Sequence, residues 1–285
     1  MQKINRHYLE VHIAVMLFGG AGIFGKLVHI PAGGIVLGRA FLGALFIFFL
    51  KKILQESFLP ESKKDIGIFA LLGSILAFHW VAFFLSIQLS SVAIGVLTFS
   101  TFPIFTTLLE PLVNKEPIKL QNLLLALIAF AGVALVMPSM DFQQQDTQGV
   151  LWGIASGISF SFLALISKRM VAQYSSNTVS FYQNGIAALI LAPFFTQSIL
   201  AGTLSDWGYL LVLGIIFTGI AHTLFINSMK SLQAQTASLI ASLEPVYGIA
   251  LAWIVLNEIP TLKMLLGGAL ILGVAFYATI RNDAE

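Results

Sequence analysis

The sequence predicts an all-α integral membrane protein of ten transmembrane helices, arranged as two inverted repeats of five helices. Two observations point to the membrane: 58% of the 285 residues are apolar, and only 10% are charged. A soluble domain carries about a quarter charged residues, so lipid is the natural solvent for this surface. The third observation is a pattern of proline and glutamate that recurs at a fixed distance along the chain.

Ten stretches of the chain are long and apolar enough to cross a bilayer, which takes about 20 residues per helix. Because isolated strands would leave backbone groups unpaired in lipid, each stretch is expected to be helical. The expected spans are 10–28, 33–52, 66–88, 92–112, 119–138, 149–169, 177–200, 207–229, 235–256 and 262–280. Short polar stretches with turn signals separate them.

The lysines and arginines test this count. With the N-terminus placed in the cytoplasm, twelve of the fifteen fall in inside segments, and only Lys26, Arg39 and Lys263 fall outside. The positive-inside rule predicts such a bias, so we expect a multi-pass protein of the inner or plasma membrane with both termini cytoplasmic. Lys3 and Arg6 before an apolar run suggest a secretory signal, but the first span has a matching partner in the second half.

The two halves of the chain repeat each other. Three residue pairs are each separated by 142 positions: Pro103 and Pro245, Glu116 and Glu258, and Lys26 and Lys168. This spacing predicts a first repeat over 1–141 and a second over 142–285. Because each repeat holds five helices, an odd number, the second is expected to be inverted relative to the first. One half can then rock against the other, which is the geometry that alternating access requires.

These motifs resemble the drug/metabolite transporter superfamily, in particular its EamA-type members with ten helices, over nearly the whole chain. Besides the doubled Pro…Glu pattern, the resemblance rests on Glu244-Pro245, Leu256-Asn257-Glu258 and the glycine-rich run from Gly267 to Gly273. The first repeat departs from the pattern, since Phe102 stands where the second repeat has Glu244. The resemblance implies a secondary transporter that exports amino acids, other metabolites or drugs, often with protons, and holds its solute between the repeats.

Glu244 is the sharpest candidate for the solute site. A carboxylate in hydrocarbon costs roughly 3 kcal/mol on insertion scales, so we expect it to face a central cavity and bind a proton or an amine. The alternative is a carboxylate that braces the backbone broken at Pro245. Pro103 and Pro245 each remove a backbone donor and are expected to kink the fourth and ninth spans near the cavity or hinge, with a simple packing kink as the alternative.

Two histidines and a tryptophan lie in the third and eighth spans. His79 and His222 suit a proton relay or a solute contact, although a hydrogen bond to a neighbouring helix is the commoner role of a membrane histidine. Trp80 either stacks on the solute or fills a helix interface. The remaining cavity candidates are polar or aromatic residues of the fourth, seventh, eighth and ninth spans: Thr98, Thr101, Gln183, Asn227 and Tyr247.

Other charged residues are expected to have structural roles. Arg39 could attract a carboxylate, but snorkelling to the headgroups is the favoured expectation. Lys26 and Lys168 are expected to mark the depth of the interface. Glu116 and Glu258 are each expected to bond the N-terminus of the next helix.

Several functions lack a sequence signal. No glycine-rich phosphate loop, zinc-ligand spacing or nucleophile elbow appears, so no cofactor or metal is expected. A net charge of +2 gives no reason to expect nucleic acid. The expected partners are a small solute such as an amino acid or related metabolite, the lipid bilayer and, as a candidate coupling ion, the proton. An intramembrane enzyme using His79, His222 and Glu244 and a passive channel stay open as alternatives.

Overall fold

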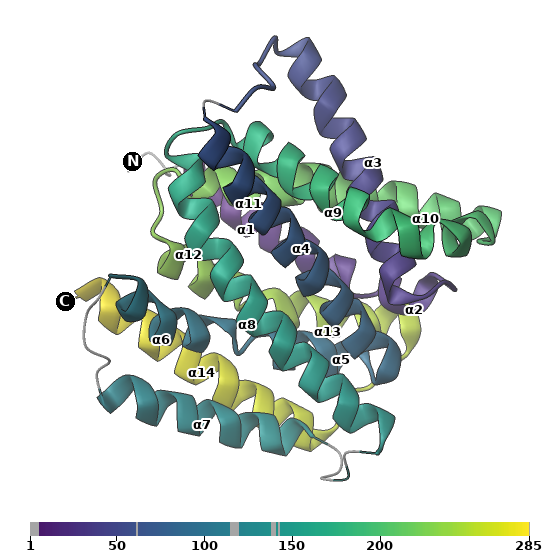
Figure 1. The fold of residues 1–285 in the computed structure, drawn as a ribbon. Coiled ribbons are helices and arrows are strands. Elements are labelled where there is room, and N and C mark those ends of the chain that lie inside the picture. Colours follow the sequence, from purple (N-terminus) through teal and green to yellow (C-terminus); the bar gives the residue numbers. More distant parts are fainter. Residues whose placement is uncertain (1–5, 61, 115–119, 138–140, 142, 285) are drawn as a thin grey trace.

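The computed structural model describes residues 6–284, except 61, 115–119, 138–140 and 142, and every regular element in them is helical (Figure 1). The first half contains α1 (Arg6–Ala21), α2 (Phe24–Leu27), α3 (Ala32–Ile53), α4 (Lys63–Leu89), α5 (Val92–Phe99), α6 (Phe102–Asn114) and α7 (Leu120–Val136). The second contains α8 (Gln145–Val171), α9 (Ser176–Leu200), α10 (Leu204–Gly214), the π-helical η1 (Ile215–Ile220), α11 (Ala221–Ser228), α12 (Ala234–Ala241), α13 (Glu244–Leu256) and α14 (Leu262–Ala284).

These helices fit a membrane. In the described residues, seven helical segments are long and apolar enough to span one, and shorter apolar helices lie in α7, α13 and α14. Large apolar side chains such as Leu127, Leu189 and Phe194 are exposed on the outer surface. That surface would be unfavourable in water and suits hydrocarbon. The all-α membrane fold predicted from the sequence is confirmed.

Two broken helices show the duplication in detail. The helix α5–α6 breaks at residues 100–101, and α12–α13 breaks at 242–243. Each boundary of the second pair lies 142 positions after its counterpart (234 against 92, and 256 against 114). The proposed boundary between repeats, at 141/142, adjoins residue 142, which lies outside the described residues.

Pro103 and Pro245 do not kink continuous helices, contrary to the sequence-based expectation. Each proline is the second residue of a new helix, because α6 begins at Phe102 and α13 at Glu244. In the first turn of a helix the missing N–H of proline leaves no hydrogen bond unmade, so the chain breaks just before the proline.

The two repeats run in opposite directions. The last helix of each repeat, α7 or α14, packs against the other (Figure 1). Gln121 Nε2, near the start of α7, donates to the Tyr277 hydroxyl near the end of α14, at 3.2 Å. Further along, a Cβ built on Gly132 would lie 2.9 Å from the backbone oxygen of Gly267. Equivalent helices that pack antiparallel show that one repeat is inverted relative to the other.

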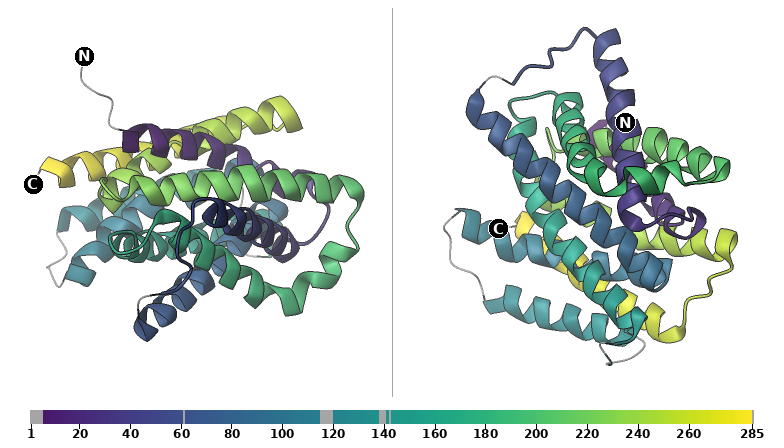
Figure 2. Two further views of the ribbon diagram at one scale, coloured as in Figure 1. Left: turned by 90° about the horizontal axis from the view of Figure 1, so that it is seen from above. Right: turned by 45° about the vertical axis from the view of Figure 1, so that its right-hand side comes forward.

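The first helix of each repeat packs into the other repeat. Helix α8 lies against α4, α5 and α6, and α1 makes the corresponding contacts with α11, α12 and α13 (Figures 1 and 2). Because each of these helices packs into the other repeat, α1 and α8 lie at the centre of the molecule, where both repeats meet.

Lys26 and Lys168 cap helix ends, where the sequence suggested only markers of interface depth. Lys26 Nζ donates to the carbonyl oxygen of Ser90, at 2.7 Å, just beyond α4. Lys168 Nζ donates to the carbonyl oxygen of Leu232, also at 2.7 Å, beyond α11. Ser90 and Leu232 are again 142 positions apart. Lysine near a helix C-terminus satisfies free carbonyls and complements the helix dipole.

A polar cluster joins the end of α3 to the start of α9. The buried Lys51 ammonium donates to Thr178 Oγ1 at 2.6 Å and to Glu56 Oε2 at 3.1 Å. Ser175 Oγ and Asn177 Nδ2 also donate to the Glu56 carboxylate, each at 2.7 Å. Burial of the Glu56 carboxyl opposes its ionisation, but these hydrogen bonds outweigh that effect and lower the pKa of Glu56.

Replacing Gly267 with valine should destabilise the contact between the repeats. A Cβ at this position would lie 2.6 Å from the backbone oxygen of Gly132, and overpacking of this kind costs about 1–3 kcal/mol. Thermal unfolding in detergent should show a lower midpoint for Gly267→Val. Gly273→Val is the matched control on α14, because a Cβ there meets nothing within 4 Å. Equal midpoints for the two variants would contradict the α7–α14 interface.

The Glu56 cluster should make stability depend on pH. Because the folded protein holds the pKa of this carboxyl below its ordinary value of 4.5, its contribution is fully present above that value. The contribution is lost as the pH falls through the lowered pKa. Unfolding of wild type and Glu56→Gln should therefore differ at pH 7 and converge below pH 4.5. Lys51→Met should show the same pH-dependent loss of stability as Glu56→Gln, whereas the exposed Lys52→Met should not. A stability difference between wild type and Glu56→Gln that is the same at every pH would refute this account.

Candidate functional site

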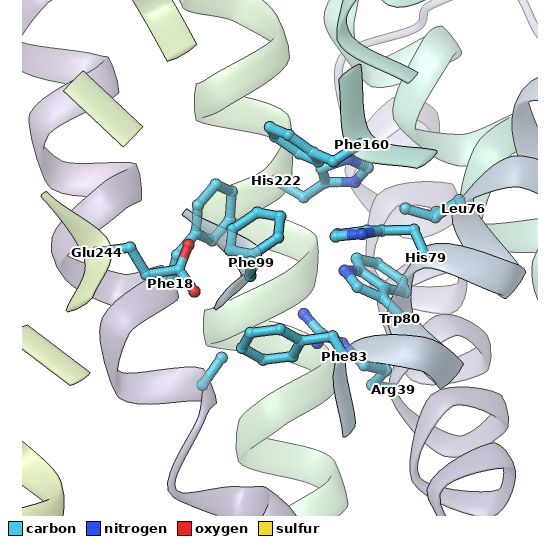
Figure 3. Close-up of a pocket in the computed structure, with 11 residues that line it drawn as sticks. Phe18, Arg39, Leu76, His79, Trp80, Phe83, Phe99, Phe160, His222 and Glu244 are labelled. Carbon is cyan, nitrogen blue, oxygen red and sulfur yellow. The ribbon is translucent and has the colours of Figure 1, made fainter. Parts of the chain in front are cut away.

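A small cavity lies at the centre of the molecule, where α1 and α8 meet helices of the opposite repeat (Figure 3). Its volume is about 30 Å³, roughly that of one water molecule in the liquid. Five aromatic residues form much of its wall: Phe18, Trp80, Phe83, Phe99 and Phe160. Its polar residues come from four different helices: Arg39, His79, His222 and Glu244.

Arg39 points into this cavity and does not snorkel, which corrects the sequence-based expectation. Its side chain starts two turns into α3 and is buried, with 2% of its surface exposed. Arg39 Nε donates to Thr218 Oγ1 at 2.9 Å, and Nη2 donates to the Phe217 carbonyl oxygen at 3.3 Å. The guanidinium carbon lies 3.9 Å from the centre of the Trp80 ring. Both partner groups of Arg39 belong to the π-helical η1, a geometry frequent at functional sites.

Glu244 is the first residue of α13 and is also buried. Its carboxylate is directed into the cavity, beside Phe18 and Phe99 (Figure 3). The N-terminal end of α13 favours a negative charge at this place. Arg39 attracts Glu244 electrostatically, although the two charges form no direct ion pair. A basic and an acidic side chain thus line one cavity without a direct contact between them.

Both histidines are anchored to neighbouring helices through Nδ1. His79 Nδ1 lies 2.9 Å from Ser156 Oγ on α8, and His222 Nδ1 lies 3.4 Å from Asn184 Nδ2 on α9. The His222 ring meets the Trp80 ring edge-on, with centroids 5.4 Å apart. This anchoring leaves Nε2 of each ring as the nitrogen available to a ligand.

Thr98 and Thr101 lie outside the lining of the cavity. Each hydroxyl donates to a backbone carbonyl of its own segment, to Ile94 and Thr98 respectively, at 2.7 Å. Such local bonds satisfy the threonine hydroxyls within their own segment. Gly153 and Gly157 of α8 pack directly against these threonines.

The structure places Gln183, Asn227 and Tyr247 away from the cavity as well. Gln183 Nε2 donates to Ser167 Oγ of α8 at 2.8 Å, while Asn227 Nδ2 donates to Glu10 Oε2 of α1 at 2.8 Å. Tyr247 is half-buried and packs against α1. His79, Trp80, His222 and Glu244 are therefore the sequence-based candidates that come together.

Glu258 binds a helix N-terminus, but in the opposite repeat. Its Oε2 accepts from the Val92 backbone N–H at the start of α5, at 3.0 Å, whereas the sequence suggested the next helix along the chain. The N-terminus of α5 lies within reach only because the repeats interlock. Glu116 lies outside the described residues.

The sequence analysis missed Arg39 and the phenylalanines as cavity residues. For Arg39 a signal existed, since a charge inside an apolar span indicates a functional site, the same argument that selected Glu244. For the phenylalanines there was none, because the chain has 24 of them and their spacing does not distinguish cavity from lipid.

A larger apolar groove, of about 580 Å³, lies between α13 and α14. Its walls include Pro245, Ile249, Trp253 and Leu265, and no charged side chain lines it. Trp253 and Leu265 are exposed on the lipid-facing surface. This groove has the chemistry of a lipid contact, whereas the central cavity combines charged side chains with burial. Among the described residues, no group of three His, Cys, Asp or Glu could hold a metal ion.

Comparison with known proteins agrees with this architecture. Two segments of the chain, residues 7–137 and 147–280, match the profile of the EamA-like transporter family. The chain belongs to this family. Each match covers one of the two halves, and together they cover nearly all of the membrane-spanning helices, as expected for a membrane fold built from repeats.

Individual relatives of this EamA-like chain are distant but full-length. It is 26% identical to the uncharacterized transporter YxxF of Bacillus subtilis, over 97% of this chain and 90% of the relative. It is 21% identical to the pseudopaline exporter CntI of Pseudomonas aeruginosa, over 85% of this chain and 84% of that protein. A crystal structure with 19% identity superposes over 98% of both chains with a TM-score of 0.69, which shows a shared fold.

Arg39 and Glu244 should depend on each other for stability. Removing one charge leaves the other buried without its counter-charge, so Arg39→Gln and Glu244→Gln should each destabilise the protein. The double variant should be less destabilised than the sum of the two, by roughly 0.5–3 kcal/mol. Unfolding in detergent measures this coupling. The control is Arg39→Gln combined with Glu258→Gln, whose effects on the free energy of unfolding should be additive. Additive effects of Arg39→Gln and Glu244→Gln would show that these two side chains do not interact.

Proposed function

We propose that this EamA-like protein is a secondary transporter that moves a small zwitterionic metabolite, such as an amino acid, by alternating access. The observation that supports this is the pair of separated, opposite charges in one cavity between inverted repeats. The guanidinium of Arg39 suits a carboxylate, and the carboxylate of Glu244 suits an ammonium group. The aromatic wall offers apolar surface to a side chain and cation–π contact to an amine.

The size of the cavity supports a transport cycle with moving halves. A volume of about 30 Å³ is too small for an amino acid, so binding one requires the cavity to widen. Opening requires one repeat to rock against the other, as in other inverted-repeat transporters. The helix breaks before Pro103 and Pro245 are the proposed hinges, since few backbone hydrogen bonds cross them.

Charge and resemblance support an orientation and a direction. The excess of lysine and arginine on one set of loops supports cytoplasmic termini in the cell membrane. Similarity to an exporter of Pseudomonas aeruginosa supports efflux. We propose that protons drive it, because Glu244 can bind a proton or a solute amine in turn, and such alternation couples the two.

Replacing Glu244 with glutamine should weaken transport. A hydrogen bond to a charged group contributes about 1.5–3 kcal/mol, so loss of the carboxylate should reduce solute flux roughly 10- to 100-fold. A thermal-shift screen of amino acids, nucleobases and sugars would select the solute. Labelled solute is then followed into liposomes from pH 5 to 8, with the exposed loop variant Asp141→Asn as the control.

Three results would contradict this proposal. Wild-type flux from Glu244→Gln across the pH range would remove Glu244 from the site. A chemically altered solute without net flux would favour an intramembrane enzyme. Flux that neither saturates nor accelerates when solute is present on the far side would favour a passive channel.

A further inference from the structure

A buried carboxylate lies near the start of α1, well away from the cavity. Glu10 has 5% of its surface exposed and accepts from Arg6 Nε at 2.8 Å, while its Oε2 lies 3.0 Å from His7 Nδ1. The same oxygen accepts from Asn227 Nδ2 of α11 at 2.8 Å. Asn227 Oδ1 in turn accepts from Ser176 Oγ of α9 at 3.1 Å. Three helices therefore meet here through polar side chains.

One helical turn further in, α9 and α11 meet through polar groups again. Thr223 Oγ1 donates to Ser180 Oγ at 3.0 Å, and Asn184 Nδ2 donates to the Ser180 carbonyl oxygen at 2.8 Å. Asn184 also contacts His222, whose ring lines the cavity. Residues four apart share a helix face, so these groups continue the line that starts at Glu10.

This arrangement is hereafter the polar ladder. It consists of Glu10, Ser176, Asn227, Ser180, Thr223 and Asn184, and it ends at His222. Polar groups at helix interfaces inside a membrane are expensive and mark ion or solute pathways. Asn184 is completely buried, and its Oδ1 has no hydrogen-bond partner among the described residues. An orphaned acceptor costs about 1–3 kcal/mol, unless a water molecule donates to it.

We propose that the polar ladder conducts protons between the central cavity and the end of the molecule where α1 begins, with Glu10 as its outer acceptor. The inference rests on the proposed transport function and adds a route for the proton that is separate from that of the solute. A proton leaves Glu244 or His222 and passes through the hydroxyls of Ser180 and Thr223 and water held by the asparagines. It binds Glu10 and then exchanges with solvent, and each group returns to its starting state.

The charges around the polar ladder agree with movement of a proton from the cavity to Glu10. Helix α1 contributes Arg6, which is mostly exposed, and His7. The one titratable residue of α9 is Tyr182, whose hydroxyl donates to the Phe58 carbonyl oxygen at 2.6 Å, and η1 and α12 contribute none. At the inner end the facing groups are those of the cavity: Arg39, His79, His222 and Glu244. Among the described residues, Glu10 is the sole carboxylate of the ladder itself.

Two assays on purified protein in liposomes separate the proton route from the solute route. Exchange of labelled against unlabelled amino acid needs no net proton movement, whereas accumulation driven by a pH gradient does. A panel of labelled amino acids serves as the probe. Glu10→Gln should retain exchange and lose gradient-driven accumulation by roughly tenfold or more, because it removes a positioned proton carrier.

Matched variants define the role of Glu10. His12→Gln removes a titratable group from the exposed face of the same helix and should leave both assays unchanged. Glu10→Asp keeps a carboxylate and should restore part of the driven accumulation. Asn227→Leu keeps Glu10 but cuts its link to Ser176, so it should show the same split between the assays. If Glu10→Gln does not fold, the same two assays on Asn227→Leu test the proposal.

The outcomes distinguish this inference from the function on which it rests. Equal losses of exchange and driven accumulation in Glu10→Gln would overturn the ladder, since they would indicate packing or the solute path. Unchanged driven accumulation in that variant, or wild-type accumulation that does not respond to the pH gradient, would also overturn it while leaving the transporter intact. A wild type that exchanges no amino acid of the panel would overturn the proposed function itself.

Discussion

The constraint that shapes this protein is that lipid offers no hydrogen bonds. Every backbone group and every charge within the bilayer must therefore find its partner inside the protein. The interface between the repeats is the interior that both halves share, and it holds Arg39, His79, His222 and Glu244. Lys26 and Lys168 meet the same constraint at the ends of α4 and α11, where they satisfy carbonyls that lipid would leave unpaired.

The duplication explains how the helices are arranged, and positions at which the two repeats differ determine the chemistry of the cavity. Equivalent positions carry Phe102 in the first repeat and Glu244 in the second. Phe102 stacks on Phe99, with ring centroids 4.9 Å apart, while Glu244 brings a charge to the same cavity that Phe99 lines. The helix breaks are symmetric, but the residues at these equivalent positions are not, because one is aromatic and the other acidic.

Hydropathy and the repeat predicted the fold well, because lipid imposes spans of nearly fixed length and the duplicated motifs mark equivalent helices. The site was predicted only in part. Glu244 and His79 were found because a polar group in an apolar span is rare, but Arg39 was assigned to the headgroups, since depth alone does not say which way a side chain points. Thr98 satisfies its own helix, and Glu258 binds a helix from the other repeat. The first is a local bond that a helical threonine can always make, whereas the second depends on a tertiary contact that local sequence does not encode.

The two ends of α1 are held by different forces. Near its end, a Cβ on Gly19 would lie 2.5 Å from that of Tyr247, and one on Gly20 would lie 2.7 Å from the Phe217 ring. This packing brings α1 into close contact with α13 and η1. Near its start, Glu10 is held by hydrogen bonds to Asn227 and to its own helix, which water can substitute at little enthalpic cost. In this conformation α1 therefore packs most closely at its glycine end and is joined to α11 by a polar contact at its start.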